Sequence, residues 1–173
     1  MKKKLTLILC FLVYTTICIG QQINLGNVAS INPDIKMRKL SKSEVLVKNA
    51  PNKPVYEQRY HNFDYTYQID DITLTLNFQK ANIDPHKLEN EKAFQMYLSG
   101  SNKKNSANID TVNNQKVLIM YFEYKNDVYY QFLTVNKSNT AIIIGQIEFP
   151  LDERAKAKSI LDDIVKNLKF RKD

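Results

Sequence analysis

The chain has 173 residues, of which 43% are hydrophobic, and it carries 25 basic against 18 acidic side chains, a formal net charge of +7. This length suits one domain with a sizeable core. Lysine and arginine are spread along the chain rather than gathered into the basic patch that nucleic-acid binding requires, so we expect no nucleic-acid partner.

The first 20 residues have the pattern of a secretory signal peptide. Three lysines follow the initial methionine, an apolar run covers residues 5–19, and a small-x-small cleavage site precedes Gln21. The apolar run is too short to favour a stable membrane span, and no longer run follows. We predict cleavage between Gly20 and Gln21, export to the periplasm or the exterior, and a mature chain without a transmembrane span. Loss of the three lysines lowers the basic count from 25 to 22 and the net charge to +4.

Both cysteines, Cys10 and Cys18, lie inside this segment, so the predicted mature chain contains none. Disulfides, thiolate nucleophiles and cysteine-ligated metals are thereby excluded. Cys18 is a candidate lipidation site, but such sites usually have Leu three residues before the cysteine and Gly, Ala or Ser directly before it. This chain has Thr15 and Ile17 there, so ordinary cleavage is favoured over a lipid anchor.

Residues 21–54 are polar and rich in proline and asparagine. Such a composition disfavours regular structure. We interpret residues 21–54 as a leader or linker in which residues 44–47 form a first edge strand. A single α+β domain is expected over residues 55–173.

Two runs of alternating apolar residues, 63–69 and 72–78, predict a β-hairpin around a turn at Asp70-Asp71. Asp84-Pro85 is typical of a helix start and Gly100 of a helix end. Apolar residues recur between them at helical spacing. They are Leu88, Phe94, Tyr97 and Leu98.

Strands are predicted over residues 107–112, 116–125, 128–135 and 140–149, and their short connections require an antiparallel meander. A helix from about Asp152 closes the chain, with acidic residues at its start, lysines at its end and one apolar stripe. The stripe comprises Leu151, Ala157, Leu161, Ile164, Val165 and Leu168.

Both faces of the meander carry apolar side chains, whereas a sheet covered on one face would show cleaner alternation. The first face includes Leu118, Met120 and Phe122, and the second includes Val117, Ile119 and Tyr121. The predicted fold class is therefore α+β: an antiparallel sheet of hairpin plus meander, covered by helices on both faces in an α/β/α sandwich.

The order of hairpin, helix, meander and closing amphipathic helix resembles the PsbP-like family, whose relatives include Ran-binding Mog-type proteins. The resemblance covers residues 55–170. It depends on the closing segment 159–170 (SILDDIVKNLKF), a helix that runs into a Lys-Phe tail, and on the strand at 142–147. It implies a domain that binds other proteins or helps to assemble them without catalysis, and it carries over no catalytic residues.

Residues typical of catalytic or metal sites are scarce. The two histidines, His61 and His86, have no further ligands at metal-binding spacing. There is no Gly-x-Ser-x-Gly elbow and no glycine-rich phosphate loop. The acid pairs at 70–71 and 162–163 are adjacent residues that point in different directions. We predict no catalytic residues, no metal and no cofactor, while a carboxylate pair assembled across the fold stays open.

Tyrosine is enriched, with 10 residues against no tryptophan. Tyr124, Tyr129 and Tyr130 flank one predicted turn of the meander, and we predict that they form an exposed partner-binding patch. The Asp-Thr-Val sequence at 110–112 resembles an acceptor for O-glycosylation of exported bacterial proteins, which makes Thr111 the predicted acceptor.

These observations favour an exported, non-catalytic domain that binds an envelope or secreted protein or assists its assembly. Two alternatives stay open at this point. One is a periplasmic immunity protein that neutralises a delivered toxin, which a neighbouring toxin gene would favour. The other is a small hydrolase-like enzyme with a site formed by scattered acids, which a deep pocket containing His61 or several carboxylates would favour.

Overall fold

The computed structural model describes residues 21–48, 65–100, 102–124 and 127–171. Within them, a seven-stranded sheet has the order β3-β4-β5-β9-β8-β7-β6, and all its neighbouring strands are antiparallel. Its strands are β3 (Arg38–Lys39), β4 (Thr66–Ile69), β5 (Ile72–Lys80), β6 (Ser106–Val112), β7 (Gln115–Tyr124), β8 (Asp127–Val135) and β9 (Ala141–Glu148). A three-stranded antiparallel sheet has the order β1-β2-β10. Its strands are β1 (Ile23–Leu25), β2 (Ala29–Ile31) and β10 (Leu168–Phe170).

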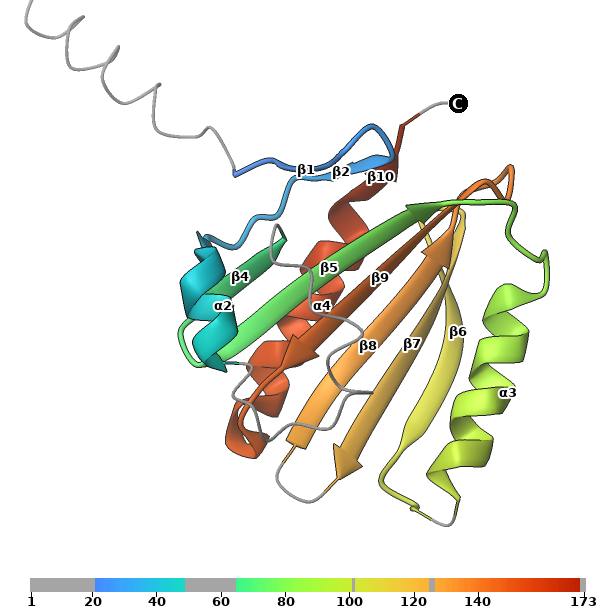
Figure 1. Ribbon diagram of the computed structural model, residues 1–173. Helices are drawn as coiled ribbons and strands as arrows, with labels where there is room; N and C mark the ends of the chain where they lie inside the picture. The colour runs from blue at the N-terminus through green and yellow to red at the C-terminus, as the bar shows by residue number, and fades with distance from the viewer. Residues whose placement is uncertain (1–20, 49–64, 101, 125–126, 172–173) are drawn as a thin grey trace, which may run out of the picture.

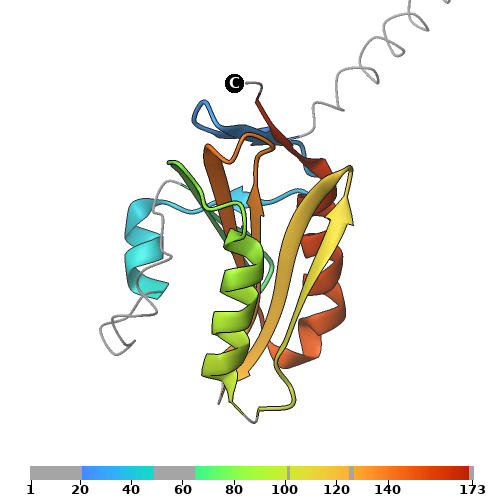
Figure 2. The ribbon, with the colours of Figure 1, turned by 90° about the vertical axis from the view of Figure 1, so that its right-hand side faces the viewer.

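Helices lie on both faces of the seven-stranded sheet, as Figures 1 and 2 show. These helices are α2 (Lys42–Lys48), α3 (Lys87–Ser99) and α4 (Arg154–Asn167), and a 3-10 turn, η2 (Leu151–Glu153), precedes α4. Helix α4 covers the face that contains the fully buried Phe132 and Ile143, and α3 covers the β6 side of the opposite face, with Leu88 above Met120. The predicted α+β class with two covered faces is confirmed.

The predictions of the hairpin, of the meander and of a helix between Asp84 and Gly100 are confirmed, and this helix is α3. Strands β4 and β5 pair around a turn in which Asp70 has φ 50°, and β6 and β7 pair around Asn113 and Asn114, which have φ 51° and 62°. Asparagine and aspartate tolerate this left-handed conformation, which two-residue hairpin turns require. Helix α3 ends at Gly100, with φ 55°.

The closing helix α4 also follows the prediction, with one correction at each end. The helix ends at Asn167, so Leu168, the last residue of the predicted stripe, is buried but lies in strand β10. Leu151 is 54% exposed, whereas Ala157, Leu161 and Ile164 are fully buried. Leu151 belongs to the 3-10 turn η2 rather than to α4. Because the two kinds of helix advance by different angles per residue, Leu151 leaves the stripe that continues through α4.

The interpretation of residues 21–54 as a polar leader is wrong for residues 23–48. Strands β1 and β2 pair with each other, and β2 also pairs with β10 at the far end of the chain. Ile23, Leu25, Val28 and Ile31 are at most 3% exposed and belong to the same apolar cluster as α4. Residues 49–54 lie outside the described residues.

The edge strand expected at residues 44–47 is also wrong, because these residues lie in α2. A capping box starts this helix: the Ser41 backbone N–H donates to Glu44 Oε2 at 2.8 Å, and the Glu44 N–H donates to Ser41 Oγ at 3.4 Å. Val45 is 2% exposed and anchors the helix. The local hydrogen bonds of the cap outweigh the β propensity of a short valine-rich run.

The capping box makes a prediction about pH. Hydrogen bonds from Ser41, first from its backbone and then from its hydroxyl, together with Arg38, lower the pKa of Glu44 from 4.5 to about 2. The ionised carboxylate therefore stabilises α2 fully above pH 4.5, and this stabilisation is lost as the pH falls toward 2. We expect an NMR titration of the Glu44 carboxyl carbon to have its midpoint near pH 2. Ser41→Ala should move the midpoint upward, and a wild-type midpoint at the ordinary value would contradict the cap.

Candidate functional site

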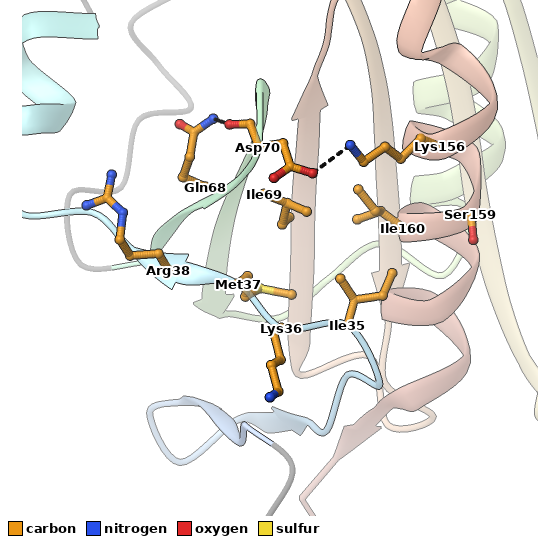
Figure 3. Close-up of a pocket in the computed structure, with 10 residues that line it drawn as sticks. All are labelled: Ile35, Lys36, Met37, Arg38, Gln68, Ile69, Asp70, Lys156, Ser159 and Ile160. Carbon is orange, nitrogen blue, oxygen red and sulfur yellow. Dashed lines mark hydrogen bonds and ion pairs between the residues drawn. The ribbon is translucent and has the colours of Figure 1, made fainter.

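A cleft of about 990 Å³ lies between residues 35–38, the β4–β5 turn and α4 (Figure 3). Four apolar side chains form its floor, and polar or charged side chains surround them. The floor consists of Ile35, Met37, Ile69 and Ile160, and the rim consists of Lys36, Arg38, Gln68, Asp70, Lys156 and Ser159.

Backbone hydrogen bonds fix the segment 35–38 beside α4. The N–H groups of Asp34 and Ile35 donate to Asp163 Oδ2 of α4 at 3.0 and 3.3 Å, and the Met37 N–H donates to Gln21 Oε1 at 3.1 Å. Side chains of an extended segment alternate in direction. Ile35 and Met37 therefore face the core, while the two cations between and after them are exposed.

One ion pair crosses the cleft from α4 to the β4–β5 turn. Lys156 Nζ lies 2.7 Å from Asp70 Oδ2 and 3.4 Å from Glu153 Oε2. The hydrogen bond to Asp70 is the main cause that raises the pKa of Lys156, and Glu153 adds to it. Arg38, on the rim of the cleft, pairs with Glu44 at 2.7 Å.

Apart from the pair of Asp70 and Lys156, the polar side chains that line the cleft do not point toward one another. In Figure 3 the Ser159 hydroxyl points away from Lys156 and Asp70, and Lys36 and Arg38 extend in different directions. Among the residues that the structure describes, no three acidic, histidine or cysteine side chains lie close enough to hold a metal ion.

A second surface lies on α3. Phe94, Tyr97 and Leu98 are 54%, 82% and 61% exposed, and we name them the α3 outer face. The helix contacts the sheet through Leu88 and Met96 instead. At about 100° per residue, the α3 outer face lies on the opposite side of the helix from these two contacts.

The predicted apolar stripe of α3 is therefore divided: only Leu88 is buried. The flank of the α3 outer face is electrically balanced, since Lys87 Nζ lies 2.8 Å from Glu91 Oε2 and Gln95 Nε2 donates to Glu91 Oε1 at 2.8 Å. Three large apolar side chains thus face solvent beside neutralised charges. This surface was not identified from the sequence.

The predicted tyrosine patch does not form. Tyr130 is 7% exposed and its ring lies 5.2 Å from that of Phe149, on the α4 face of the sheet. Tyr129 lies on the α3 face, with its ring 5.2 Å from that of Phe122. Consecutive residues of a strand point to opposite faces, so these two tyrosines cannot share a surface. The side chain of Tyr124 lies outside the described residues.

Tyr130 and its cross-strand neighbour Tyr121 belong to a cluster that also contains the Arg154 guanidinium. The Arg154 guanidinium lies 4.1 Å from the centre of the Tyr121 ring, and the Tyr121 hydroxyl donates to Glu123 Oε2 at 3.0 Å. Hydrogen bonds from Lys104 and then Tyr121 hold the pKa of Glu123 below its usual range. These contacts join the start of α4 to the sheet.

The remaining predicted residues are placed as follows. Thr111 is exposed on the edge strand β6 and remains the predicted glycosylation acceptor. His86 is exposed at the start of α3, where its backbone N–H donates to Asp84 Oδ1 at 2.8 Å. Gln21 contacts Met37 as described, whereas Gly20 and His61 lie outside the described residues, and cleavage at Gly20 stays a prediction.

The structure is similar to the solution structure of cyanobacterial PsbP (CyanoP) from Synechocystis sp. PCC 6803. The TM-score is 0.54 at 10% sequence identity, and the match covers 90% of this chain and 96% of that one. A crystal structure from Bacteroides thetaiotaomicron VPI-5482 matches with a TM-score of 0.37 at 11% identity, over 88% of this chain and 42% of that one. No protein-family model matches the sequence, and the comparison with curated proteins gave no significant match.

The chain therefore has a PsbP-like fold, which confirms the resemblance expected from the order of its elements. In the described part of the chain, no helix has both the length and the apolar character needed to cross a membrane.

Proposed function

We propose that this protein is an exported, non-catalytic accessory domain that binds another extracytoplasmic protein through the α3 outer face. The exposure of that face is the observation that carries the proposal. Four large apolar side chains are exposed among the described residues, and three of them lie within five consecutive positions of α3. Contiguous exposed apolar side chains on a soluble domain mark interaction sites.

The arrangement of the α3 outer face defines the chemistry of its partner. Positions 94, 97 and 98 have the i, i+3, i+4 spacing by which a helix inserts its apolar side into a groove of another protein. Aromatic side chains are enriched in the centres of such interfaces. The partner would present an apolar groove, and the Lys87–Glu91 pair would lie at the rim.

Two further observations support export and an accessory role. The first 20 residues have the charge and hydropathy pattern of a signal peptide. The PsbP-like fold fits a domain that assists other proteins without catalysis.

Replacing the α3 outer face should weaken partner capture. The variant Phe94→Gln, Tyr97→Gln, Leu98→Gln removes three apolar anchors, and interface anchors contribute more than about 1 kcal/mol each, so we expect capture in a quantitative pull-down from the envelope fraction to fall at least about tenfold. Glutamine is a good helix former, and the three side chains are more than half exposed, so the thermal midpoint should change little.

Leu151→Gln provides the matched control, because Leu151 is 54% exposed but lies at the start of α4 rather than on α3. This variant should capture the partner as the wild type does. Equal capture by the triple variant and the wild type, with unchanged folding, would contradict the assignment.

A further inference from the structure

We propose that the cleft described above binds an extended acidic segment of a partner protein, and that a carboxylate of this segment replaces Asp70 at Lys156. The inference rests on the proposed function only in taking a protein as the ligand. It concerns a surface separate from α3, and it specifies which residue types the bound segment would contain.

The first support is the alternation of apolar and cationic side chains along one wall. Ile35 and Met37 face the core and form part of the apolar floor of the cleft, whereas Lys36 and Arg38 are exposed at its rim (Figure 3). An extended chain also alternates with a period of two residues. A segment in which apolar and acidic residues alternate would therefore match this wall.

The second support is the charge of the lining. Three cations, Lys36, Arg38 and Lys156, line the cleft against a single acid, Asp70. Arg38 is paired with Glu44 outside the lining. For Lys36 we find no hydrogen bond or ion pair with the residues that the structure describes. Lys156 is paired with Asp70 and with Glu153. Among the described residues, Lys36 is therefore the lining cation that has no acidic partner, and an acidic segment would neutralise it.

The third support is the exposure of the resident pair. The Asp70 side chain is 75% exposed and that of Lys156 is 40% exposed, although their charged atoms are only 2.7 Å apart. Exposed ion pairs contribute at most about 1 kcal/mol. Exchanging one carboxylate for another at Lys156 conserves the ion pair, so the exchange costs little. Asp70 therefore acts as an internal competitor for the ligand carboxylate.

Because Asp70 competes with the ligand, we expect that removing its charge raises the affinity of the cleft for an acidic segment. Asp70→Asn keeps the shape of the side chain, and asparagine tolerates the φ of 50° at this turn. The substitution removes the competing charge of Asp70 and leaves Glu153, at 3.4 Å, as the acidic partner of Lys156 among the described residues. It should therefore strengthen the binding of an acidic segment, whereas a purely structural role of the pair predicts no gain.

The probe is an acetylated and amidated hexapeptide of alternating valine and glutamate, titrated into the isotope-labelled chain from Gln21 onward and followed by NMR. We expect amide shifts at residues 35–38 and 156–160 and none from a peptide in which glutamine replaces glutamate. Lys156→Gln should weaken binding about threefold, and Lys36→Gln combined with it about tenfold, as expected for exposed charge pairs. Asp70→Asn should strengthen binding about twofold.

The matched control is Lys158→Gln, on the same helix, because Lys158 pairs with Asp162 at 2.5 Å and does not line the cleft. It should bind the peptide as the wild type does. Equal response to both peptides, no shift at the cleft, weaker binding by Asp70→Asn, or binding only to vesicles of anionic phospholipid would overturn the proposal. The α3 triple variant should keep full peptide binding, so failure of one proposal is distinguishable from failure of the other.

Discussion

Gly145→Ala is expected to destabilise the domain by about 3 kcal/mol, at the upper end of the range for overpacked cores. Gly145 of β9 lies directly opposite Phe132 of β8, and the phenyl ring lies across the glycine. A Cβ atom at position 145 would stand 2.0 Å from Cε1 and 2.2 Å from Cζ of that ring. Phe132 is 0% exposed beneath α4, so the ring has no open space into which it can move.

Denaturant unfolding of Gly145→Ala and wild type measures this effect. In the double variant with Phe132→Leu, the smaller side chain should recover part of the loss, because the two substitutions act on one contact. Gln146→Ala, at the next position and on the other face, is the control for strand propensity. A free energy of unfolding for Gly145→Ala within about 0.5 kcal/mol of wild type would contradict this packing.

A chain that begins at residue 42 is not expected to fold. The deletion removes the apolar side chains of Ile23, Leu25, Val28 and Ile31, none of which is more than 3% exposed. Burial of each contributes about 1.5–3 kcal/mol, and a whole domain is stable by only about 5–15 kcal/mol. The deletion also leaves β10 without its partner β2.

Circular dichroism and thermal unfolding of this truncated chain test the expectation. The point variant Ile31→Ala should lose about 3 kcal/mol through the cavity that it creates. Asn27→Ala, at an exposed position of the β1–β2 turn, should change stability by less than about 0.5 kcal/mol. A cooperative transition of the truncated chain at the wild-type midpoint would show that residues 21–41 are dispensable.

The elements that the sequence predicted are those with a local signal. The hairpin, the meander and α4 show periods of 2 and 3.6 residues over seven or more positions, and turn residues such as Asp70 and Asn113 lie between strands. Strands β1 and β2 have three residues each, too few for a period to be seen. Strand β2 pairs with β10, more than 130 residues away, and β1 pairs in turn with β2. No local pattern encodes the long-range pairing that fixes them.

The surfaces were harder to predict than the fold. Helical spacing identified α3, but which side of the helix faces the sheet depends on the strands beneath it, and Leu88 and Met96 make that contact. The cleft brings together Lys36, Asp70 and Lys156, which lie far apart along the chain. In contrast, the placement of Tyr129 and Tyr130 on opposite faces of the sheet follows from the two-residue period of a strand alone.

Photo-crosslinking in living cells provides the decisive measurement of the proposed function. A photoreactive amino acid replaces Tyr97, which is 82% exposed at the centre of the α3 outer face, and a second chain carries it at Leu151 as the control. We expect the chain with the photoreactive residue at position 97 to lose its first 20 residues and to form a light-dependent adduct with one extracytoplasmic protein. The chain with the photoreactive residue at position 151 should not form this adduct. The same adducts at both positions, or an unprocessed chain that stays in the cytosol, would contradict partner binding through α3 outside the cytoplasm.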